Sequence, residues 1–422
     1  MKKNILIIGV LLHLAFSLQA QTTGPDYIKN NLINQGVFNV PDFEFTSDYT
    51  SYNPYSNIQG LFMTGLDYLG DSTKVFCWYG VPETLMPGET APAVVLAHGG
   101  GGDAFTTWVK KWTDRGYIAI AIALEGQVPD DDPNWAYSGP VRGGFFIDVL
   151  NDLSDQWFYH AVADIIMANS LLRTFPEVDS NNIGITGISW GGILTNVTTG
   201  IDNRFKFAIP VYGCGYLHTT PLYGGAINNF SETQRNAYMD NWEPSLYIPF
   251  QNQPTLFVNG TNDFHFSMNA FTNTYKTFNS EKYLRIEYDM PHGHEPGWSR
   301  NDIYDFADYI IQGTHPLTYT DITVNNRVVS YEYDFDGTVN EALLYYCIDT
   351  ADWQKDNYEW LPLKANLDIT AQTATAQIPN NAVAYFMNIS DTISDGIYSS
   401  VIETIAPTTK YILRRRRPLY HR

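Results

Sequence analysis

The sequence is poor in cysteine and in basic residues. Among its 422 residues are three cysteines, Cys77, Cys214 and Cys347. They are odd in number and far apart, so we expect no disulfide framework and interpret them as small buried apolar residues. Lys and Arg number 25 against 45 Asp and Glu, which gives a net charge of −20. This acidic balance argues against nucleic acid as a partner and favours neutral or cationic substrates.

Long apolar runs are also scarce, with one exception at the N-terminus. Lys2 and Lys3 precede the mainly apolar stretch 5–18, and Leu18-Gln19-Ala20 fits a small-residue cleavage site. We therefore expect residues 1–20 to be a cleaved signal peptide and the mature chain to be secreted or periplasmic. No cysteine follows the cleavage site, and no other run approaches the roughly 20 apolar residues of a membrane span. The sequence therefore predicts no membrane anchor.

The composition is that of a folded protein with an unusual share of aromatic residues. Hydrophobic residues make up 44% and charged residues 17%, which is globular rather than disordered, and the length allows two or three domains. Aromatic residues make up 15%. Such rings suit carbohydrate surfaces, although core packing is their commoner role.

Short apolar runs alternate with helical patterns over the first three quarters of the chain. A hairpin within 60–81 comes first, and the strand-like and helical runs that follow lie at 93–97, 105–115, 117–124, 156–175, 183–186, 205–212, 255–259, 266–278, 283–288 and 301–312. This alternation predicts an α/β fold with a mostly parallel, doubly wound sheet. After residue 314 the apolar residues recur with period two between turn residues, which predicts a small all-β sandwich.

These patterns divide the chain into five segments. We expect a signal peptide at 1–20, an extended N-terminal arm with one short helix at 21–59, an α/β domain at 60–315 that holds the functional site, a β-sandwich at 316–405 and a disordered basic tail at 406–422. Residues 214–249, rich in Tyr and Asn, form an expected insertion at the rim of the site. The connection between the two folded domains is short, which predicts a packed interface rather than a tethered module. Trp353 and Trp360 could stack on sugar, but we expect packing.

The stretch Asn181–Thr195, NNIGITGISWGGILT, contains the strongest functional signal. Gly187, Ser189 and Gly191 have the G-x-S-x-G spacing of a nucleophile elbow, between an apolar strand and a helix start. A serine on so sharp a turn has strained backbone angles, and side chains two residues away would clash. We therefore predict Ser189 as a nucleophile and the Trp190 N–H as an oxyanion donor at the positive end of the helix.

A serine nucleophile needs a base and an orienting carboxylate, which follow it in the order acid, then His, in this architecture. Asp263 follows the strand-like run TLFVN and is the expected acid, with a turn-capping role as the alternative. Two histidines follow the last strand-like run, in MPHGHEPGW. We predict His294 as the base, because Gly293 lets the loop turn its imidazole toward the serine. His292 is the alternative base, or a loop residue that lines the site, and His265 is expected at the rim.

The second oxyanion donor is expected in the glycine run after strand 93–97. Glycines let the backbone approach the substrate, although a run of four could also be a simple flexible turn. We predict Gly100 as the donor, and we expect the substrate to be lined by His98, Gly99, Gly101, Glu125 and His292. No metal or other cofactor is expected, because H-x-x-H, H-E-x-x-H and paired Cys–His spacings are missing.

Several of these stretches together resemble a known family. The run from Trp157 to Gly192, PVYGCG at 210–215, NGTND and PHGHEPGW are similar to secreted bacterial α/β-hydrolases of the acetyl xylan esterase and dienelactone hydrolase group. The resemblance covers about residues 60–312. It implies triad roles for Ser189, Asp263 and His294, and removal of acetyl groups from xylan or related sugars. The C-terminal sandwich and the 214–249 insertion depart from the family pattern.

Three functions are compatible with this sequence. The first is a secreted serine esterase that acts on an acylated carbohydrate or another small ester, without nucleic acid or a membrane anchor. The second is an exported serine peptidase of the prolyl oligopeptidase type, for whose large N-terminal propeller residues 21–90 are too short. The third is a non-enzymatic glycan-binding protein on a hydrolase fold, which a missing triad member would favour, although candidates for all three members are present.

Overall fold

The computed structural model describes residues 23–130, 132, 135–313, 318–319, 322–334, 339–348, 359–391 and 396–405. The expected signal peptide at 1–20, the basic tail at 406–422 and Trp353 lie outside these residues. Within the described part, no helix has the length and apolar character needed to cross a membrane. The three cysteines are buried and free, as predicted.

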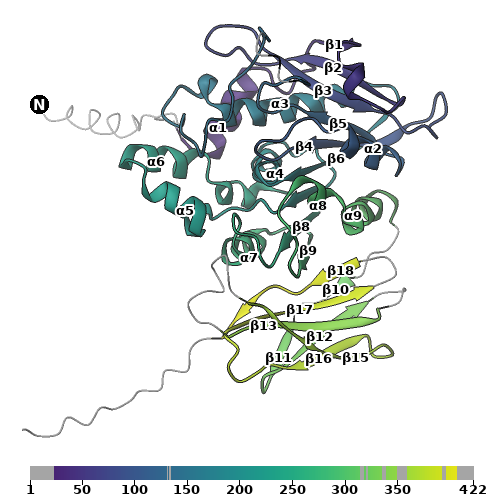
Figure 1. The fold of residues 1–422 in the computed structure, drawn as a ribbon, viewed down its shortest axis with the longest axis vertical. Coiled ribbons are helices and arrows are strands. Elements are labelled where there is room, and N and C mark those ends of the chain that lie inside the picture. The colour runs from purple at the N-terminus through teal and green to yellow at the C-terminus, as the bar shows by residue number, and fades with distance from the viewer. Residues whose placement is uncertain are drawn as a thin grey trace, which may run out of the picture.

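A nine-stranded sheet forms the larger part of the molecule (Figure 1). Its strands are β1 (Phe43–Thr46), β2 (Ile58–Thr64), β3 (Lys74–Gly80), β4 (Ala91–Ala97), β5 (Ile118–Ile122), β6 (Val178–Ile188), β7 (Ala208–Val211), β8 (Thr255–Gly260) and β9 (Lys282–Glu287). Their order is β1-β2-β3-β5-β4-β6-β7-β8-β9. β1, β2 and β3 are antiparallel, whereas β4 to β9 are parallel. This is the predicted α/β-hydrolase architecture.

Helices cover both faces of this sheet because its crossovers change direction. The chain passes from β4 to β5 on one side of β4 and then to β6 on the other, so right-handed connections put α2 and α3 on opposite faces. The helices of the larger domain are α1 (Pro25–Asn34), α2 (Thr106–Thr113), α3 (Trp157–Leu172), α4 (Trp190–Ile201), α5 (Pro221–Asn228), α6 (Glu232–Asn241), α7 (Met268–Thr277), α8 (His294–Trp298) and α9 (Asn301–Gln312). Single 3₁₀ turns lie at Thr50–Tyr52, Leu153–Asp155, Leu217–Thr219, Pro244–Leu246 and Ile248–Phe250.

The segment expected as an N-terminal arm is part of the core. Its one helix, α1, buries Ile28 and Leu32 completely and packs near α4. β1 pairs antiparallel with β2, from Phe43 opposite Met63 to Thr46 opposite Gly60. β1 alternates apolar and polar residues, but it has four residues and stays largely exposed at the edge of the sheet, so the sequence alone did not reveal so short a strand.

The predicted insertion at 214–249 folds into α5, α6 and three 3₁₀ turns beside the carboxyl ends of the parallel strands (Figure 1). Its buried polar groups tie it to the rest of the domain. The Trp242 indole N–H donates to Gln156 Oε1 at 2.7 Å, and the Gly215 N–H donates to Thr274 Oγ1 of α7 at 2.9 Å. The insertion is therefore a packed element of the site's rim rather than a loose loop.

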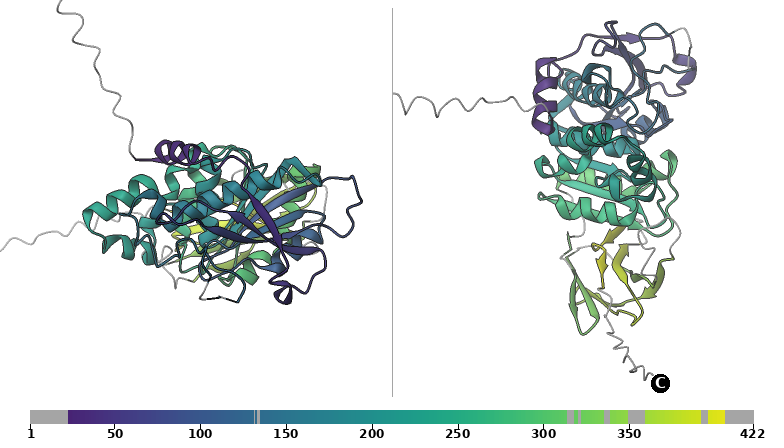
Figure 2. Two further views of the ribbon diagram at one scale, coloured as in Figure 1. Left: turned by 90° about the horizontal axis from the view of Figure 1, so that it is seen from above. Right: turned by 90° about the vertical axis from the view of Figure 1, so that its left-hand side faces the viewer.

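The C-terminal residues form two antiparallel sheets at the end of the molecule beyond β9 (Figure 2). One sheet has the order β10-β12-β16-β15 with β11 on β12, and the other has the order β14-β13-β17-β18 with β19 on β17. The strands are β10 (Thr318–Tyr319), β11 (Thr323–Asn325), β12 (Val328–Asp334), β13 (Glu341–Cys347), β14 (Leu361–Lys364), β15 (Asn366–Asp368), β16 (Thr373–Gln377), β17 (Ala384–Asp391), β18 (Gly396–Ser399) and β19 (Glu403–Thr404). Buried side chains of β12, β13, β16 and β17 form one core, so the sheets pack as a sandwich.

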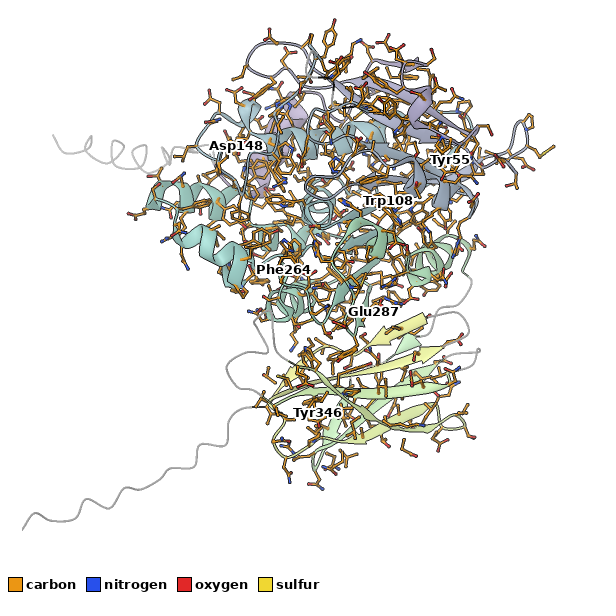
Figure 3. The ribbon with its side chains drawn as sticks, viewed as in Figure 1. Tyr55, Trp108, Asp148, Phe264, Glu287 and Tyr346 are labelled. Atoms are coloured by element: carbon orange, nitrogen blue, oxygen red, sulfur yellow. The ribbon has the colours of Figure 1, made fainter. Side chains whose placement is uncertain are left out.

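The sandwich packs directly on the hydrolase domain. Strand β18 lies beside β9, and Figure 3 labels Glu287 of β9 at this boundary. The Ile286 N–H donates to Ser399 Oγ at 2.7 Å, while Asn388 Nδ2 donates to the Ile286 carbonyl at 2.9 Å. Strands β13 and β17 are buried on both faces, and Phe386 joins the apolar core of the hydrolase domain. Trp360 is 2% exposed at the same interface, so it packs and is not available to stack on sugar.

This interface predicts a large stability effect at Phe386. Its ring is fully buried, stacked on Tyr345 at 5.1 Å and in edge contact with Trp360 at 4.9 Å. We expect Phe386→Ala to lower the free energy of unfolding by about 3–5 kcal/mol, because it leaves a cavity between the domains. Urea unfolding measures the change. Leu363→Ala, on the more exposed β14, is the matched control and should cost less than about 1 kcal/mol. Equal effects of the two variants would show that the domains do not depend on this contact.

Candidate functional site

Ser189 sits on the predicted strained turn between β6 and α4. Its backbone has φ 58° and ψ −112°, a conformation that residues other than glycine rarely adopt. A Cβ on Gly187 would overlap the Gly191 carbonyl, and a Cβ on Gly191 would overlap the Ala97 carbonyl of β4. The two glycines of the motif are therefore required by the close approach of three backbone segments. The strain keeps the hydroxyl of Ser189 at the carboxyl edge of the sheet.

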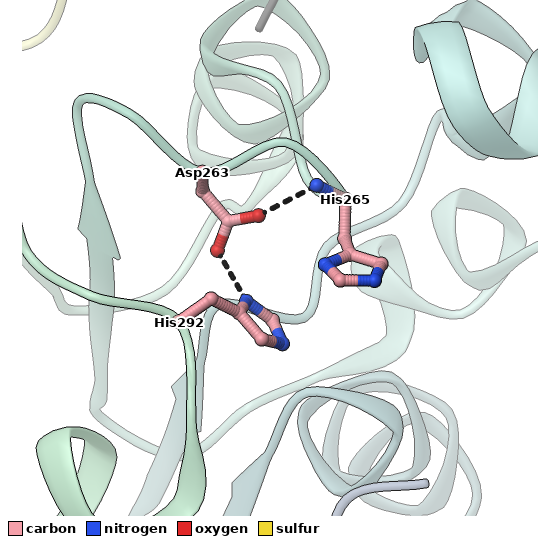
Figure 4. A group of neighbouring side chains, drawn as sticks. All are labelled: Asp263, His265 and His292. Atoms are coloured by element: carbon pink, nitrogen blue, oxygen red, sulfur yellow. Dashed lines mark hydrogen bonds and ion pairs between the residues drawn. The ribbon is translucent and has the colours of Figure 1, made fainter.

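A hydrogen-bonded chain links Ser189, His292 and Asp263 (Figure 4 shows the last two). His292 Nδ1 lies 2.7 Å from Asp263 Oδ2, and its Nε2 lies 3.1 Å from Ser189 Oγ. The carboxylate can only accept, so Nδ1 carries the proton and Nε2 accepts from the hydroxyl. Asp263 Oδ1 accepts the backbone N–H groups of His265 and Phe266 at 2.8 and 2.9 Å, which fixes the carboxylate. This is the geometry of a serine nucleophile with its base and orienting acid.

The expectation that His294 is the base does not agree with this geometry. His294 begins α8, and its Nε2 accepts the Gly99 N–H at 2.9 Å instead of facing Ser189. The reason is the loop after β9, which already brings His292 to Ser189 before α8 starts. Gly293 has φ 168°, an extended conformation that any residue adopts, so the glycine that favoured His294 on sequence grounds makes no special turn.

Two aromatic side chains lie against the His292 ring: Tyr212, which the sequence analysis did not assign to the site, and His265, which it expected at the rim. Tyr212, at φ 64°, lies with its ring 4.5 Å from the imidazole, and its hydroxyl donates to the Pro291 carbonyl at 2.8 Å. The His265 ring lies 4.5 Å from that of His292 on the other side. Burial, and secondly the charge of His292, lower the pKa of His265 to about 4, so it is a neutral neighbour at pH 7. Because His265 follows Asp263 by two residues, its place in the sequence could have indicated that it lies close to the acid.

The glycine loop after β4 lies against the nucleophile. Trp190 is the first residue of α4, where a backbone N–H has no acceptor within the helix. The Gly99 carbonyl accepts the Gly102 N–H at 2.9 Å and lies 2.7 Å from His98 Nδ1. Because this carbonyl and the Gly100 N–H belong to one trans peptide unit, the Gly100 N–H points the opposite way. A Cβ on Gly100 would lie 2.9 Å from Cδ1 of Trp190, so the two residues are neighbours, and their role as oxyanion donors stays a prediction.

His98 does not line the substrate site as expected. It is 3% exposed, and its Nε2 accepts the Leu124 N–H at 2.9 Å, so Nδ1 carries the proton that is donated to the Gly99 carbonyl. Burial lowers its pKa to about 4, and the charge of Arg142 acts in the same direction. His98 directly follows the buried strand β4, and its ring bonds the backbone of the loop after β4 and of the loop after β5. These two hydrogen bonds connect the glycine loop to the loop after β5.

Glu125 borders a cavity of about 550 Å³ next to the glycine loop. Its carboxylate accepts from Arg142 Nε at 3.0 Å, and its Oε1 lies 3.4 Å from the Gly101 N–H. The Arg142 guanidinium lies over the Trp190 ring at 5.1 Å. The sequence analysis did not single out this arginine, which lies in a segment without helix or strand. The cavity is lined by Gly101, Gly102, Asp103, Phe105, Glu125, Gly126, Gln127, Val128, Asp132, Trp135, Ser138 and Val141.

Asp263, His265 and His292 are also of types that bind metal ions, and their nearest ligand atoms lie within 4.8 Å of one another. The hydrogen bonding favours a different use. His292 Nδ1 must keep its proton to donate to Asp263, and a protonated ring nitrogen cannot ligate a metal. The three side chains therefore fit a proton-transfer site better than a metal centre.

Comparisons with known proteins agree with this site. The family model described as acetyl xylan esterase matches residues 58–221, and the model described as the prolyl oligopeptidase family matches residues 147–311. The first match includes Ser189 and the glycine loop, and the second includes Ser189, Asp263 and His292. These matches confirm the resemblance to acetyl xylan esterases that the motifs indicated.

Solved structures with a similar fold include two acetyl xylan esterases. One, from Paenibacillus sp. R4, is 20% identical with a TM-score of 0.55 and aligns over 67% of this chain and 93% of its own. Another, from Thermoanaerobacterium sp. JW/SL YS485, is 16% identical with a TM-score of 0.54 and aligns over 68% and 93%. At these identities they establish the fold. A probable dipeptidyl-peptidase 5 of Aspergillus terreus is 25% identical over 147 residues, 33% of this chain but 18% of that protein.

The buried imidazoles predict a specific dependence of stability on pH. His98 and His265 have pKa values of about 4 in the folded protein and about 6.5 when unfolded. As the pH falls from about 6.5 to about 4, the unfolded chain takes up protons that the folded chain does not, so the free energy of unfolding decreases. We expect His98→Asn to make this decrease shallower, as measured by urea unfolding at pH 7 and pH 4.5.

His218 supplies the matched control for this measurement. Its pKa is raised by the Glu243 carboxylate, whose Oε2 lies 3.8 Å from its Nδ1, so its contribution to the free energy of unfolding is present at low pH and is lost as the pH rises. His218→Asn should therefore make the decrease on acidification steeper. Identical slopes for wild type, His98→Asn and His218→Asn would show that the imidazoles do not govern acid stability.

Proposed function

We propose that this chain, an α/β-hydrolase of the serine esterase and peptidase type, is an exported esterase that removes acyl groups, foremost acetyl groups, from xylan or related carbohydrates. The observation that carries the proposal is the hydrogen-bonded series Asp263–His292–Ser189. Such a series, together with Gly100 and Trp190 as the proposed oxyanion donors, is suited to acyl transfer through a tetrahedral intermediate.

In the proposed mechanism Ser189 Oγ attacks the ester carbonyl carbon while His292 Nε2 takes the hydroxyl proton. The carbonyl oxygen becomes an oxyanion, which the Gly100 and Trp190 N–H groups and the N-terminus of α4 stabilise. His292 then gives its proton to the departing alcohol oxygen as the C–O bond breaks, which leaves an acyl-serine. A water molecule then attacks the acyl-serine carbonyl carbon while His292 takes its proton. The second tetrahedral intermediate collapses, which releases the carboxylic acid and restores the Ser189 hydroxyl. Asp263 holds the tautomer of His292 and stabilises the transient imidazolium.

Two features support a carbohydrate as the alcohol part. The 550 Å³ cavity beside the glycine loop combines aromatic rings, Trp135 and Phe105, with carboxylate, amide and hydroxyl groups, which suits a polyhydroxylated ring. The matching family model and the similar solved structures are described as acetyl xylan esterases. The signal-like sequence of residues 1–20 supports export, which would give access to extracellular polymer.

A peptidase is the second candidate, because a specific observation favours it. The prolyl oligopeptidase family match spans Ser189, Asp263 and His292, and curated relatives are named as peptidases. The chain spans less than a fifth of the length of these relatives. The same catalytic series would serve either reaction, so the choice between them depends on the substrate.

The triad assignment predicts that Ser189→Ala and His292→Ala each lower kcat/KM for p-nitrophenyl acetate by on the order of 10⁴-fold. Each removes a group that takes part in the bond-making step. His294→Ala should be milder than His292→Ala, because its imidazole does not face the nucleophile. Ser280→Ala, at a serine that bonds the Gln251 carbonyl, is the matched control and should retain wild-type turnover. If His294→Ala proved the more damaging histidine variant, His292 could not be the base.

The ester assignment predicts a preference among substrates. We expect acetylated xylan, acetylated monosaccharides and short p-nitrophenyl esters to be hydrolysed, with rates that fall as the acyl chain lengthens, and dipeptidyl anilides to be hydrolysed at least about 10²-fold more slowly. Released acetate and p-nitroaniline measure the two activities, each with and without a chelator, which should have no effect. Faster release of p-nitroaniline than of acetate would favour the peptidase.

A further inference from the structure

We propose that His294 is a positioning residue that holds the glycine loop in the conformation required for oxyanion binding. The inference rests on the proposed function, since it concerns the loop that supplies the Gly100 donor. The imidazole of His294 lies against the glycine loop, where its Nε2 would be within 3.0 Å of a Cβ on Gly99. Its Nε2 accepts the Gly99 N–H at 2.9 Å.

Residue Gly99 is held at both of its peptide units. His294 accepts from its N–H, while His98 Nδ1 and the Gly102 N–H donate to its carbonyl. The Gly99 carbonyl is part of the same rigid peptide as the Gly100 N–H, so any rotation of Gly99 turns the oxyanion donor. Glycine has the widest choice of backbone angles, and four glycines in a row would otherwise let this peptide rotate. The two imidazoles remove that freedom.

The fit of the ring against the loop supports a dedicated contact. A Cβ on Gly99 would lie 3.0 Å from His294 Nε2, and a Cβ on Gly102 would lie 2.5 Å from the same atom. Gly99 and Gly102 therefore leave the space that the His294 ring occupies, whatever space the substrate also requires. The ring itself is held by Phe105 at 4.9 Å and by Trp298, of its own helix α8, at 6.2 Å.

The protonation state agrees with an acceptor role. Burial lowers the pKa of His294, because the charged imidazolium is poorly solvated there. A neutral imidazole keeps the lone pair on Nε2 that the Gly99 N–H requires. In the segment H-G-H, His292 thus bonds the Ser189 hydroxyl, and His294 bonds the glycine loop.

Matched substitutions at one position test the inference. Gln places an acceptor oxygen at about the reach of Nε2, whereas Leu has similar bulk and no acceptor. We expect His294→Leu to lower kcat for p-nitrophenyl acetate by about 10²-fold with KM little changed, the loss typical of one oxyanion donor. His294→Gln should stay within about tenfold of wild type. Affinity for a trifluoromethyl ketone, whose serine adduct carries an oxyanion, should fall in parallel with kcat in the Leu variant only.

Further readouts separate positioning from a loss of folded protein. Thermal melting and titration of active serine with a fluorophosphonate report the folded fraction, and kcat is expressed per active site. Should His294→Leu fail to fold, His294→Asn replaces it, because its shorter amide cannot reach the Gly99 N–H. Unchanged kcat in the Leu or Asn variant, or a Gln variant as impaired as Leu, would overturn the inference. Turnover that survives in Ser189→Ala would instead overturn the proposed function itself.

Discussion

The close approach of backbone at the carboxyl ends of β4 and β6 is the constraint on which the site depends. Gly187 and Gly191 leave room for the Gly191 and Ala97 carbonyls, where any Cβ would overlap them. That contact places Ser189 directly beside the glycine loop that begins at His98, because β4 and β6 are neighbouring strands. The strain at Ser189 persists because the packed sheet surrounds it and allows no relaxation.

Histidines around this contact have different roles because each makes different hydrogen bonds. His292 lies between a carboxylate and a hydroxyl, which is the arrangement for moving a proton. His98 and His294 bond backbone groups of the glycine loop and stay neutral through burial. The His265 ring packs against the His292 ring, with their centroids 4.5 Å apart. The chemistry of each imidazole is thus set by its partners rather than by the residue type.

The C-terminal sandwich is an integral part of the fold. Strands β13 and β17 present apolar side chains on both faces, one toward the sandwich core and the other toward β9. Asp302 of α9 forms an ion pair with Arg285 and also accepts the Ile397 N–H at 3.0 Å, so the interface has polar as well as apolar contacts. A strand buried on both sides cannot be exposed without a large loss of stability, which ties the two domains together.

The sequence by itself determined the elements whose signals are local. The parallel strands, the elbow at Ser189, Asp263 after β8 and the sandwich strands such as β12 and β17 follow from apolar runs, glycine spacing and period-two patterns, which depend on neighbours along the chain. The edge strand β1 and the strands β14 and β18 have four residues each, too few for such a pattern to identify a strand. Their pairing depends on distant segments.

Only the tertiary structure decided which histidine faces Ser189. His292 and His294 follow the same strand two residues apart, and nothing in the local sequence distinguishes their distances to a serine about a hundred positions earlier. The choice depends on where the loop after β9 crosses the edge of the sheet and where α8 begins. Arg142 and the inward turn of His98 escaped the sequence for the same reason, because their partners, Glu125 and Leu124, lie on another loop. Side-chain direction at a sheet edge is set by packing across strands, which sequence spacing does not encode.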